Sequence, residues 1–555
     1  MKIKLLFRIL GITLLVGFIT IGIYALGVQF NWYGELENKG EVIKSPYPEK
    51  LLLEKKENQI IVNKSTKQIL FGDTHVHSTY STDAFLWSLP ILNGEGPHPI
   101  SDACNYARFC SALDFWVTTD HAEASSPRKW REIKESVRQC NEVSNKKDPD
   151  LVTFLGYEWT QVGLYAEDHY GHKNVMFLDI EEGKVPARPI GAGGVATNGM
   201  RATIGGQASQ LKPLAFFDFK NRHRYFNFIS FTEELPGIPY CELGVDSSLL
   251  PEDCYEYADT PVELFSKLRQ LDFPAIVIPH GNTWGFYSPP LSSLDKQLKQ
   301  GFHDEKIQIL FEVMSGHGNS EEYRPWRAAN LKEDGSLECP EPSSNYLPSC
   351  WRAGEIIEDR CLKEGLSESI CAKREIEARK NYLSLGSSGY LSIPGAEMED
   401  WYDSGQCKDC FIPSFNYRPA GSGQYALSLT NFDQAEQKRF RFGFIASSDN
   451  HRSRPGTGYK EKDRFVTTEA NGPSNEAIAD ILYPKSPKQS KSIDFGGREG
   501  LVNMGFAAFE VERQASFFTS GGLAAVHSVD RDRQSIWDSM KRKETYGTSG
   551  DRILL

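Results

Sequence analysis

Short apolar runs that end in a histidine or a carboxylate recur along this chain and constrain its fold more than any other feature. They begin at residues 68, 113, 151, 275, 307 and 442 and read QILFGDTHVH, LDFWVTTDH, LVTFLGYEW, AIVIPHGN, IQILFEVMSGH and FGFIASSDNH. Their apolar parts are rich in β-branched and aromatic residues, which is typical of buried parallel strands. The pattern therefore predicts strands whose ends carry polar side chains.

A helical pattern separates the second run from the third. Trp130, Ile133, Val137 and Cys140 recur at helical spacing, and Pro127 lies near the start of the stretch. Residues 530–546 predict a second amphipathic helix late in the chain. Strands that alternate with helices predict an α/β domain with a parallel sheet. In α/β barrels built on a parallel sheet, functional side chains gather at the C-terminal ends of the strands. Residues that are far apart in sequence can therefore meet at one point.

The polar residues at the run ends are of the types that bind metals. His75 and His77 are two residues apart on an extended chain, so both imidazoles can reach one ion. Histidine and carboxylate ligands without thiolates suit zinc, manganese or iron in hydrolysis, and a carboxylate can bridge two ions. Any one of these residues could instead have a structural role, but the joint pattern favours a metal site. The pattern contributes His75, His77, Asp83, His121, Glu158, His280, Asp449 and His451.

Taken in order, these residues resemble the PHP (polymerase and histidinol phosphatase) superfamily. The finer resemblance is to its often exported branch, the domain-of-unknown-function family 3604, and it covers roughly residues 68–555. The segments that carry it are FGDTHVHSTYSTDAF, LDFWVTTDHAE, YEWTQ, GHKNVMF, IPHGN, FEVMSGHGNSE, ASSDNH and SIWDSMKRKETYGTSGDRI. Relatives are expected to continue beyond GDRILL, which predicts that the chain is truncated at its C-terminus.

The resemblance implies a distorted seven-stranded (β/α) barrel with large loop insertions and two or three divalent metal ions. It adds His172 to the ligands, and His169, three residues earlier, could take its place. Asp83 occupies a position that is His in some relatives. The implied ligand sets are His75, His77, Glu158 and Asp449 for the first ion, Glu158, His172 and His280 for the second, and Asp83, His121 and His451 for the third.

Further residues at the run ends are candidates for catalysis. Asp120 could orient the nucleophile or a ligand imidazole. Glu312 and His317 are candidates for substrate contact or leaving-group protonation, although Glu312 could equally support a ligand and His317 could lie on a surface loop. These features predict a metal-dependent hydrolase, with a phosphoester as the favoured substrate. The alternatives are hydrolysis of a sulfate ester or an amide, and a non-catalytic envelope binding module.

The N-terminus predicts a location outside the cytoplasm. Lys2, Lys4 and Arg8 precede an uncharged stretch of membrane-spanning length, which ends near residue 28. A signal anchor facing the periplasm or the extracellular space is favoured over a cleaved signal peptide followed by secretion. The predicted organisation is residues 1–28 as anchor or signal peptide, 29–66 as linker, and 67–555 as the hydrolase domain, with insertions near 181–260 and 319–430.

The cysteines and the net charge limit the cellular compartment and the kinds of partner that this chain can have. The cysteines fall into close sets, including Cys104 with Cys110 and Cys407 with Cys410, while Cys140 stands apart. In an oxidising compartment these sets predict disulfides, with a local bond favoured for Cys407 and Cys410. A net charge of -12 argues against a nucleic-acid partner. The expected partners are a small-molecule or envelope-component ester and the membrane, and the pattern leaves the oligomeric state open.

Overall fold

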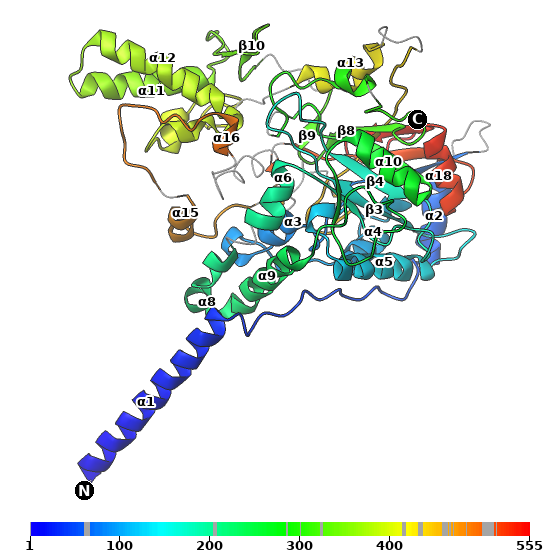
Figure 1. The fold of residues 1–555 in the computed structure, drawn as a ribbon, viewed down its shortest axis with the longest axis horizontal. Coiled ribbons are helices and arrows are strands. Elements are labelled where there is room, and N and C mark those ends of the chain that lie inside the picture. The colour runs from blue at the N-terminus through cyan, green and yellow to red at the C-terminus, as the bar shows by residue number, and fades with distance from the viewer. Residues whose placement is uncertain are drawn as a thin grey trace.

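One long N-terminal helix projects from a mixed α/β body in the computed structural model (Figure 1). The structure describes residues 2–59, 67–203, 208–284, 287–299, 301–321, 326–412, 418–430, 437–457, 464, 468–469, 471–483, 485–501, 516–517 and 519–555. The projecting helix is α1 (Lys2–Gln29), and its apolar segment Lys4–Gln29 is long enough to cross a bilayer. Such a helix fits a membrane span and also a signal sequence.

A curled seven-stranded sheet forms the centre of the body. Its order is β14-β13-β1-β2-β3-β4-β7. The strands β1, β2 and β3 are parallel, whereas β4, β13 and β14 are antiparallel to their neighbours. The bounds are β1 (Gln68–Asp73), β2 (Phe115–Val117), β3 (Val152–Trp159), β4 (Lys173–Phe177), β7 (Ala275–Pro279), β13 (Leu523–Ser528) and β14 (Thr545–Thr548).

A second small sheet lies across the two edges of the curled sheet. It consists of β12 (Gly443–Ala446), β8 (Leu310–Ser315) and β9 (Gly318–Asn319), with β8 and β12 parallel. On one side, the Val277 N–H of β7 donates to the Ile307 carbonyl just before β8, at 2.8 Å. On the other, the Thr545 hydroxyl of β14 donates to the Phe444 carbonyl of β12, at 3.0 Å.

All six apolar runs form strands, which confirms the strand prediction. The prediction of a parallel sheet holds only in part, because β4 and β13 run antiparallel to β1, β2 and β3. β14 pairs antiparallel with β13. Two of these strands have a weak sequence signal, because β4 (KNVMF) begins with two polar residues and β14 (TYGT) has no apolar run. β13 (LAAVHS) does begin with a short apolar run, which sequence reasoning did not single out. All three are strands because their backbones complete the ladder beside strongly apolar neighbours.

Helices cover the sheet, and two of them were predicted. In α5 (Pro127–Glu142), the Ser126 hydroxyl caps the Lys129 N–H, and Trp130, Ile133 and Val137 are buried. In α18 (Arg533–Lys541), Ile536, Trp537 and Met540 face the core, as predicted, but the helix is shorter than 530–546. Others near the sheet are α2 (Glu49–Gln59), α3 (Thr82–Trp87), α4 (Ile100–Phe109) and α10 (Pro261–Leu271).

The two expected insertions carry most of the remaining elements. Near 181–260 these are β5 (Ile190–Ala192), α6 (Val195–Asn198), α8 (Leu214–Phe217), α9 (Arg222–Glu234) and β6 (Glu256–Ala258). Near 319–430 they are β10 (Asn330–Leu331), β11 (Leu337–Glu338), α11 (Ser349–Lys363), α12 (Glu368–Ser384) and α13 (Gly423–Ser428). The later helices α15 (Glu476–Leu482) and α16 (Arg498–Leu501) follow. Figure 1 shows α11 and α12 far from α1.

Five disulfides join cysteines in the described residues: Cys104–Cys140, Cys241–Cys254, Cys339–Cys350, Cys361–Cys371 and Cys407–Cys410. The local Cys407–Cys410 bond is confirmed. Grouping Cys104 with Cys110 is wrong, because Cys110 is free and exposed while Cys104 is buried. Six residues along a helix turn two side chains to different faces. The disulfides and the apolar N-terminal helix together indicate a protein of a non-cytoplasmic compartment.

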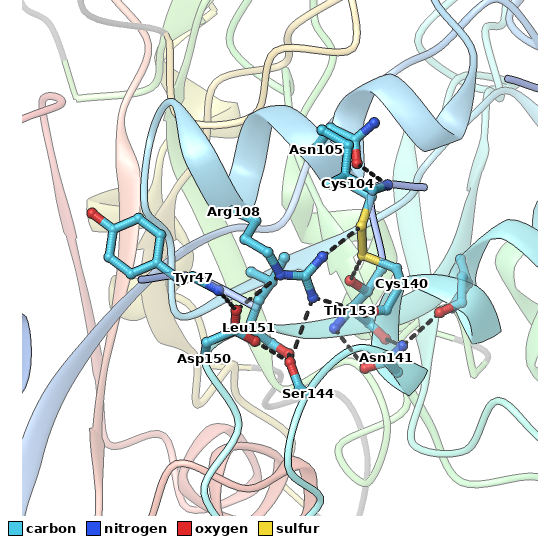
Figure 2. The surroundings of a disulfide bond; sticks show 12 residues. Tyr47, Cys104, Asn105, Arg108, Cys140, Asn141, Ser144, Asp150, Leu151 and Thr153 are labelled. Atoms are coloured by element: carbon cyan, nitrogen blue, oxygen red, sulfur yellow. Dashed lines mark hydrogen bonds and ion pairs between the residues drawn. A yellow bond between two sulfur atoms is a disulfide. The ribbon is translucent and has the colours of Figure 1, made fainter. Parts of the chain in front are cut away.

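The Cys104–Cys140 disulfide joins α4 to α5 beside a buried ion pair (Figure 2). There the Arg108 guanidinium donates to Asp150 at 2.9 Å and to the Cys140 carbonyl at 2.8 Å. We expect the double substitution Cys104→Ala/Cys140→Ala to lower the free energy of unfolding by ~2–4 kcal/mol, because the bond closes a long loop in the unfolded chain. Urea denaturation measures this loss. Cys110→Ala is the control, and equal stability of both variants would contradict the prediction.

Candidate metal centre

The nine predicted ligands converge at one end of the curled sheet. His75 and His77 follow β1, His121 follows β2, and Glu158 lies in β3. His172 immediately precedes the antiparallel strand β4, so it reaches the same end as His280, which follows β7. The last two ligands, Asp449 and His451, follow β12. Seven of the nine are buried, and Asp83 and His172 are partly buried. The chain reversal into β4 brings His172 beside Glu158.

Glu158 lies at the centre of the cluster. Its Oε1 is 2.7 Å from His172 Nδ1 and 3.1 Å from His280 Nε2. Its Oε2 is 3.3 Å from His77 Nε2 and 3.5 Å from His75 Nε2. The two carboxylate oxygens therefore face two different groups of imidazoles. This is the arrangement by which a carboxylate bridges two cations.

Asp449 completes the group around the first pair of histidines. Its Oδ1 is 3.1 Å from His75 Nε2 and 3.4 Å from His77 Nε2. Its backbone has φ 52°, in the left-handed region that side-chain-bearing residues rarely adopt. Such backbone strain is concentrated at functional sites, where the surrounding structure enforces it. Here it directs the carboxylate toward both imidazoles.

Asp83 forms the third group with two histidines from different strands. Its Oδ2 is 3.0 Å from His121 Nε2 and 3.5 Å from His451 Nε2. The ring of His77 stacks on that of His451 at 4.1 Å, so the third group adjoins the first. The three ligand sets expected from the resemblance are thus neighbours in the fold.

The donor atoms fit divalent cations. Metal–nitrogen and metal–oxygen bonds of about 2.0–2.2 Å place neighbouring ligands ~3–3.5 Å apart, and most of the separations above lie in this range. The Nε2 atoms of His75 and His77 are buried and make no hydrogen bond. Buried polar atoms without hydrogen-bond partners are costly unless another group engages them. Groups able to hold an ion include His75 with His77 and Asp449, and His75 with Glu158 and His280.

The clustered carboxyl and imidazole groups shift one another's pKa values. Burial raises the pKa of the Glu158 carboxyl, but His121, His280 and His172 outweigh it and hold that pKa well below its usual range. Burial lowers the pKa of His172 to about 4, so this imidazole is neutral near pH 7, as a metal ligand must be. In the same cluster, burial lowers the pKa values of His75, His121 and His451, but the neighbouring carboxylates outweigh it and raise them, so these imidazoles would release a proton on binding a cation.

Hydrogen-bonding partners lie beside the Nδ1 atoms of three of the ligand histidines. Glu312 lies 3.2 Å from His75 Nδ1, and Thr160 Oγ1 lies 2.7 Å from His121 Nδ1. The Ser81 hydroxyl lies 2.9 Å from His77 Nδ1. Partners of this kind set the tautomer and the ring orientation of metal-binding histidines.

Asp120 acts on the cluster through the same serine. Its carboxylate accepts hydrogen bonds from the Ser81 hydroxyl at 2.9 Å and from the Ser78 backbone N–H at 2.7 Å. The Ser81 hydroxyl in turn reaches His77 Nδ1. Asp120 is therefore placed to orient a ligand imidazole, one of the two roles expected for it.

The sequence left open whether His169 or His172 belongs to the cluster. The structure places His172 against Glu158, with its ring stacked on Tyr287 at 4.2 Å. His169 points elsewhere, since its Nδ1 accepts a hydrogen bond from the Gly163 N–H at 3.3 Å. His172 is thus the residue that the structure brings to the other ligands.

Sequence reasoning missed Glu469, which lies beside the cluster. Its Oε2 is 3.1 Å from His317 Nε2, and its Oε1 accepts from the His451 backbone N–H at 3.0 Å. His317 Nδ1 lies 2.8 Å from Asp449 Oδ2, so His317 sits between two carboxylates. His317 is buried, which excludes the surface-loop alternative. Glu469 follows no apolar run, so only its spacing from His451 could have suggested it.

We expect Glu469→Gln to weaken metal binding by ~10–100-fold, the usual loss when a partner of a ligand is removed. The substitution keeps the side-chain shape but removes the charge beside His317 and His451. Titration of the metal-free chain with Mn²⁺ measures the affinity. Glu476→Gln, at an exposed position of α15, is the control. Equal affinities of the two variants would rule out this positioning role.

The fold and the site define an α/β protein with a candidate polynuclear metal centre. The chain is similar to the family described as protein of unknown function (DUF3604), whose model matches residues 64–127 and 426–555. These ranges contain six of the nine clustered residues. No curated protein matches the chain. A solved structure from Bacteroides vulgatus ATCC 8482, of a two-domain protein containing a predicted PHP-like metal-dependent phosphoesterase, shares 10% identity, with a TM-score of 0.29 and coverage of 93% of this chain and 69% of that one.

Proposed function

We propose that this protein is a metal-dependent phosphoesterase with a PHP-type barrel, acting outside the cytoplasm. The observation that carries the proposal is the bridging position of Glu158, whose two oxygens face two groups of imidazoles. A carboxylate that joins two cation sites is typical of hydrolytic centres with paired metals. A single structural ion would need only one such group.

Each of the three donor sets is proposed to bind one metal ion. His75, His77 and Asp449 with Glu158 would hold one ion, Glu158 with His172 and His280 a second, and Asp83 with His121 and His451 a third. When bound, zinc, manganese or iron ions activate water and neutralise the charge that develops on a phosphoryl group. Two or three ions fit these sets.

The surrounding residues keep the ligands in place. Glu312 holds His75 through Nδ1, and Asp120 holds His77 through Ser81. Both ring nitrogens of His317 face carboxylates, those of Asp449 and Glu469. We therefore propose positioning roles for Glu312 and His317 in place of leaving-group protonation. With one carboxylate at each ring nitrogen, His317 is placed to hold the Asp449 carboxylate in position.

The choice of phosphorus as the centre attacked is supported by the resemblance of the motifs to the PHP superfamily. The ligand chemistry alone favours hydrolysis without specifying the bond. The same centre could cleave a sulfate ester or an amide, and a chain that only binds an envelope component would use the ions for structure. Assays with phosphate, sulfate and amide substrates distinguish these three possibilities.

The test uses the full chain in detergent, loaded with Mn²⁺ or Zn²⁺. The substrates are p-nitrophenyl phosphate, bis-p-nitrophenyl phosphate, p-nitrophenyl sulfate and p-nitroacetanilide. We expect hydrolysis of one or both phosphate esters, and loss of activity in His75→Ala with His98→Ala, which lies outside the cluster, as the matched control. Turnover of only the sulfate or the amide would replace the phosphoesterase proposal. Full metal occupancy with no turnover of any substrate would refute a hydrolase.

A further inference from the structure

An exposed aromatic patch lies in the first insertion, on the segment 212–224 that contains α8. The patch consists of Phe216, Phe217 and Phe219, whose exposed fractions are 46%, 86% and 55%. Adjacent large aromatic residues that face solvent indicate a surface that another apolar phase covers. The patch lies outside the metal centre, and the proposed function leaves it unexplained.

The patch adjoins the end of the candidate membrane helix. The Tyr24 ring of α1 lies 5.2 Å from Phe216 and 5.7 Å from Phe219, and the Tyr24 hydroxyl donates to the Ala215 carbonyl at 2.9 Å. The Lys212 ammonium donates to the Gln29 carbonyl at 2.8 Å. Figure 1 shows α8 at the point where α1 meets the body. These contacts fix the patch at a definite level along α1.

That level corresponds to the surface of a bilayer. The candidate span runs from Lys4 to Gln29, and Tyr24 lies five residues before its end. A helix rises 1.5 Å per residue, so Tyr24 lies about 8 Å from that end, near the boundary between acyl chains and headgroups. If α1 crosses the membrane, residues packed on Tyr24 lie close to where the chain emerges. Aromatic side chains are enriched at this depth.

The charge of the same segment suits a membrane surface. Lys212, Lys220, Arg222 and Arg224 are its basic residues, and Asp218 is its single acidic residue. The Asp218 carboxylate accepts hydrogen bonds from Tyr225 and Asn221, and the four basic residues outnumber it. The segment is thus locally basic in a chain whose net charge is -12. Clustered basic residues beside a membrane span attract anionic lipid headgroups.

We propose that segment 212–224 is a second membrane contact, which inserts its aromatic patch into the headgroup region of a bilayer containing anionic phospholipid. Together with α1, it holds the body in a fixed orientation at the membrane surface. This membrane contact is independent of the proposed hydrolysis and requires that α1 spans the membrane.

The test places a fluorophore at Phe217 of the full chain. Phe217→Cys is made in a Cys110→Ser background, labelled with bimane and reconstituted into phosphatidylcholine–phosphatidylglycerol vesicles with or without nitroxide-labelled lipid. We expect a shift of the emission to shorter wavelength and strong quenching by nitroxide on the headgroup or the upper acyl chain. Ile376→Cys on α12, which is far from α1, is the matched control and should stay solvent-like and unquenched.

A label at Leu15→Cys in α1 reports whether the helix itself is inserted. Quenching at Leu15 by deep acyl nitroxide, with a Phe217 label that behaves like the Ile376 control, would overturn the proposal. So would an unquenched label at Leu15. A blue-shifted Phe217 label that no lipid nitroxide quenches would indicate a second copy of the chain on the patch and would also overturn it.

The basic residues of the segment can be tested separately from its aromatic patch. Lys220→Glu/Arg222→Glu should reduce quenching of the Phe217 label in vesicles that contain phosphatidylglycerol, because the segment then repels the anionic headgroups. In vesicles of phosphatidylcholine alone the same variant should change quenching less. Equal effects in both lipids would contradict the assignment to anionic phospholipid.

Discussion

Glu158→Gln should abolish hydrolysis and strip the protein of most of its metal. The substitution keeps the size of the side chain but removes the charge that faces both His172 and His77. The loss in turnover should exceed the ~10–100-fold typical of a residue that only supports a ligand. Because both oxygens contribute, we expect two of the proposed ions to be weakened together. Metal content and kcat/KM for the phosphate esters measure the two effects.

A buried carboxylate nearby supplies the matched control. Glu123 is buried, its pKa is raised by burial, and its Oε1 accepts a hydrogen bond from the Thr160 N–H at 3.1 Å. Glutamine at this position keeps an acceptor oxygen, so Glu123→Gln should retain its metal. Retention of both metal and activity in Glu158→Gln would show that Glu158 does not bridge cations. Equal metal loss in both variants would point to a disturbed fold.

The sequence predicted the parts of the site that rest on strong local signals. Six apolar runs predicted six strands, and four of these strands belong to the curled sheet, so their C-terminal ends lie at one end of that sheet. The other two, β8 and β12, belong to the small sheet that contacts both edges of the curled sheet. His280, at the end of AIVIP, could be assigned from its own segment alone. Its partner His172 could not, because it depends on the unpredicted antiparallel strand β4, which turns the chain back toward Glu158.

Other features were beyond the reach of sequence because they depend on tertiary packing. Cys104 pairs with Cys140 only because α4 and α5 lie side by side, whereas Cys110 is nearer in sequence. Glu469 lies outside any periodic segment and becomes relevant only where its chain passes His317 and His451. Local patterns cannot encode such long-range contacts, so they emerge only from the fold.

The linker between the N-terminal helix and the body is also tied down by tertiary contacts. Its helix α2 supplies Lys55, whose ammonium lies 2.6 Å from Asp114, and Gln59, whose amide donates to the same carboxylate at 2.6 Å. From the other end of the chain, Arg531 pairs with Asp114 Oδ1, the same oxygen that Lys55 contacts. Asp114, at the start of β2, thus joins segments that are hundreds of residues apart.

Asp114→Asn should therefore lower the free energy of unfolding by ~3–5 kcal/mol, the usual cost of leaving a buried charge without its partner. Asparagine keeps an acceptor for the Phe71 N–H, which donates to Asp114 at 2.8 Å, but leaves Lys55 and Arg531 uncompensated. Urea denaturation near pH 7 measures the loss. Asp148→Asn is the matched control, because Asp148 pairs with Lys56 of the same helix at an exposed position. Its expected cost is ~0–1 kcal/mol.

The pH dependence identifies the charge as the cause. Burial raises the pKa of Asp114, but Arg531 and Lys55 outweigh it and hold that pKa well below the usual range. A carboxyl with a depressed pKa stabilises the fold fully above its unfolded value of about 3.9, and this stabilisation is lost as the pH falls toward the folded pKa. The gap between wild type and Asp114→Asn should thus be constant from neutral pH down to about 5 and shrink below about 4. A gap unchanged at the lowest pH at which both proteins fold would show that packing, and not the ionised carboxylate, sets the cost.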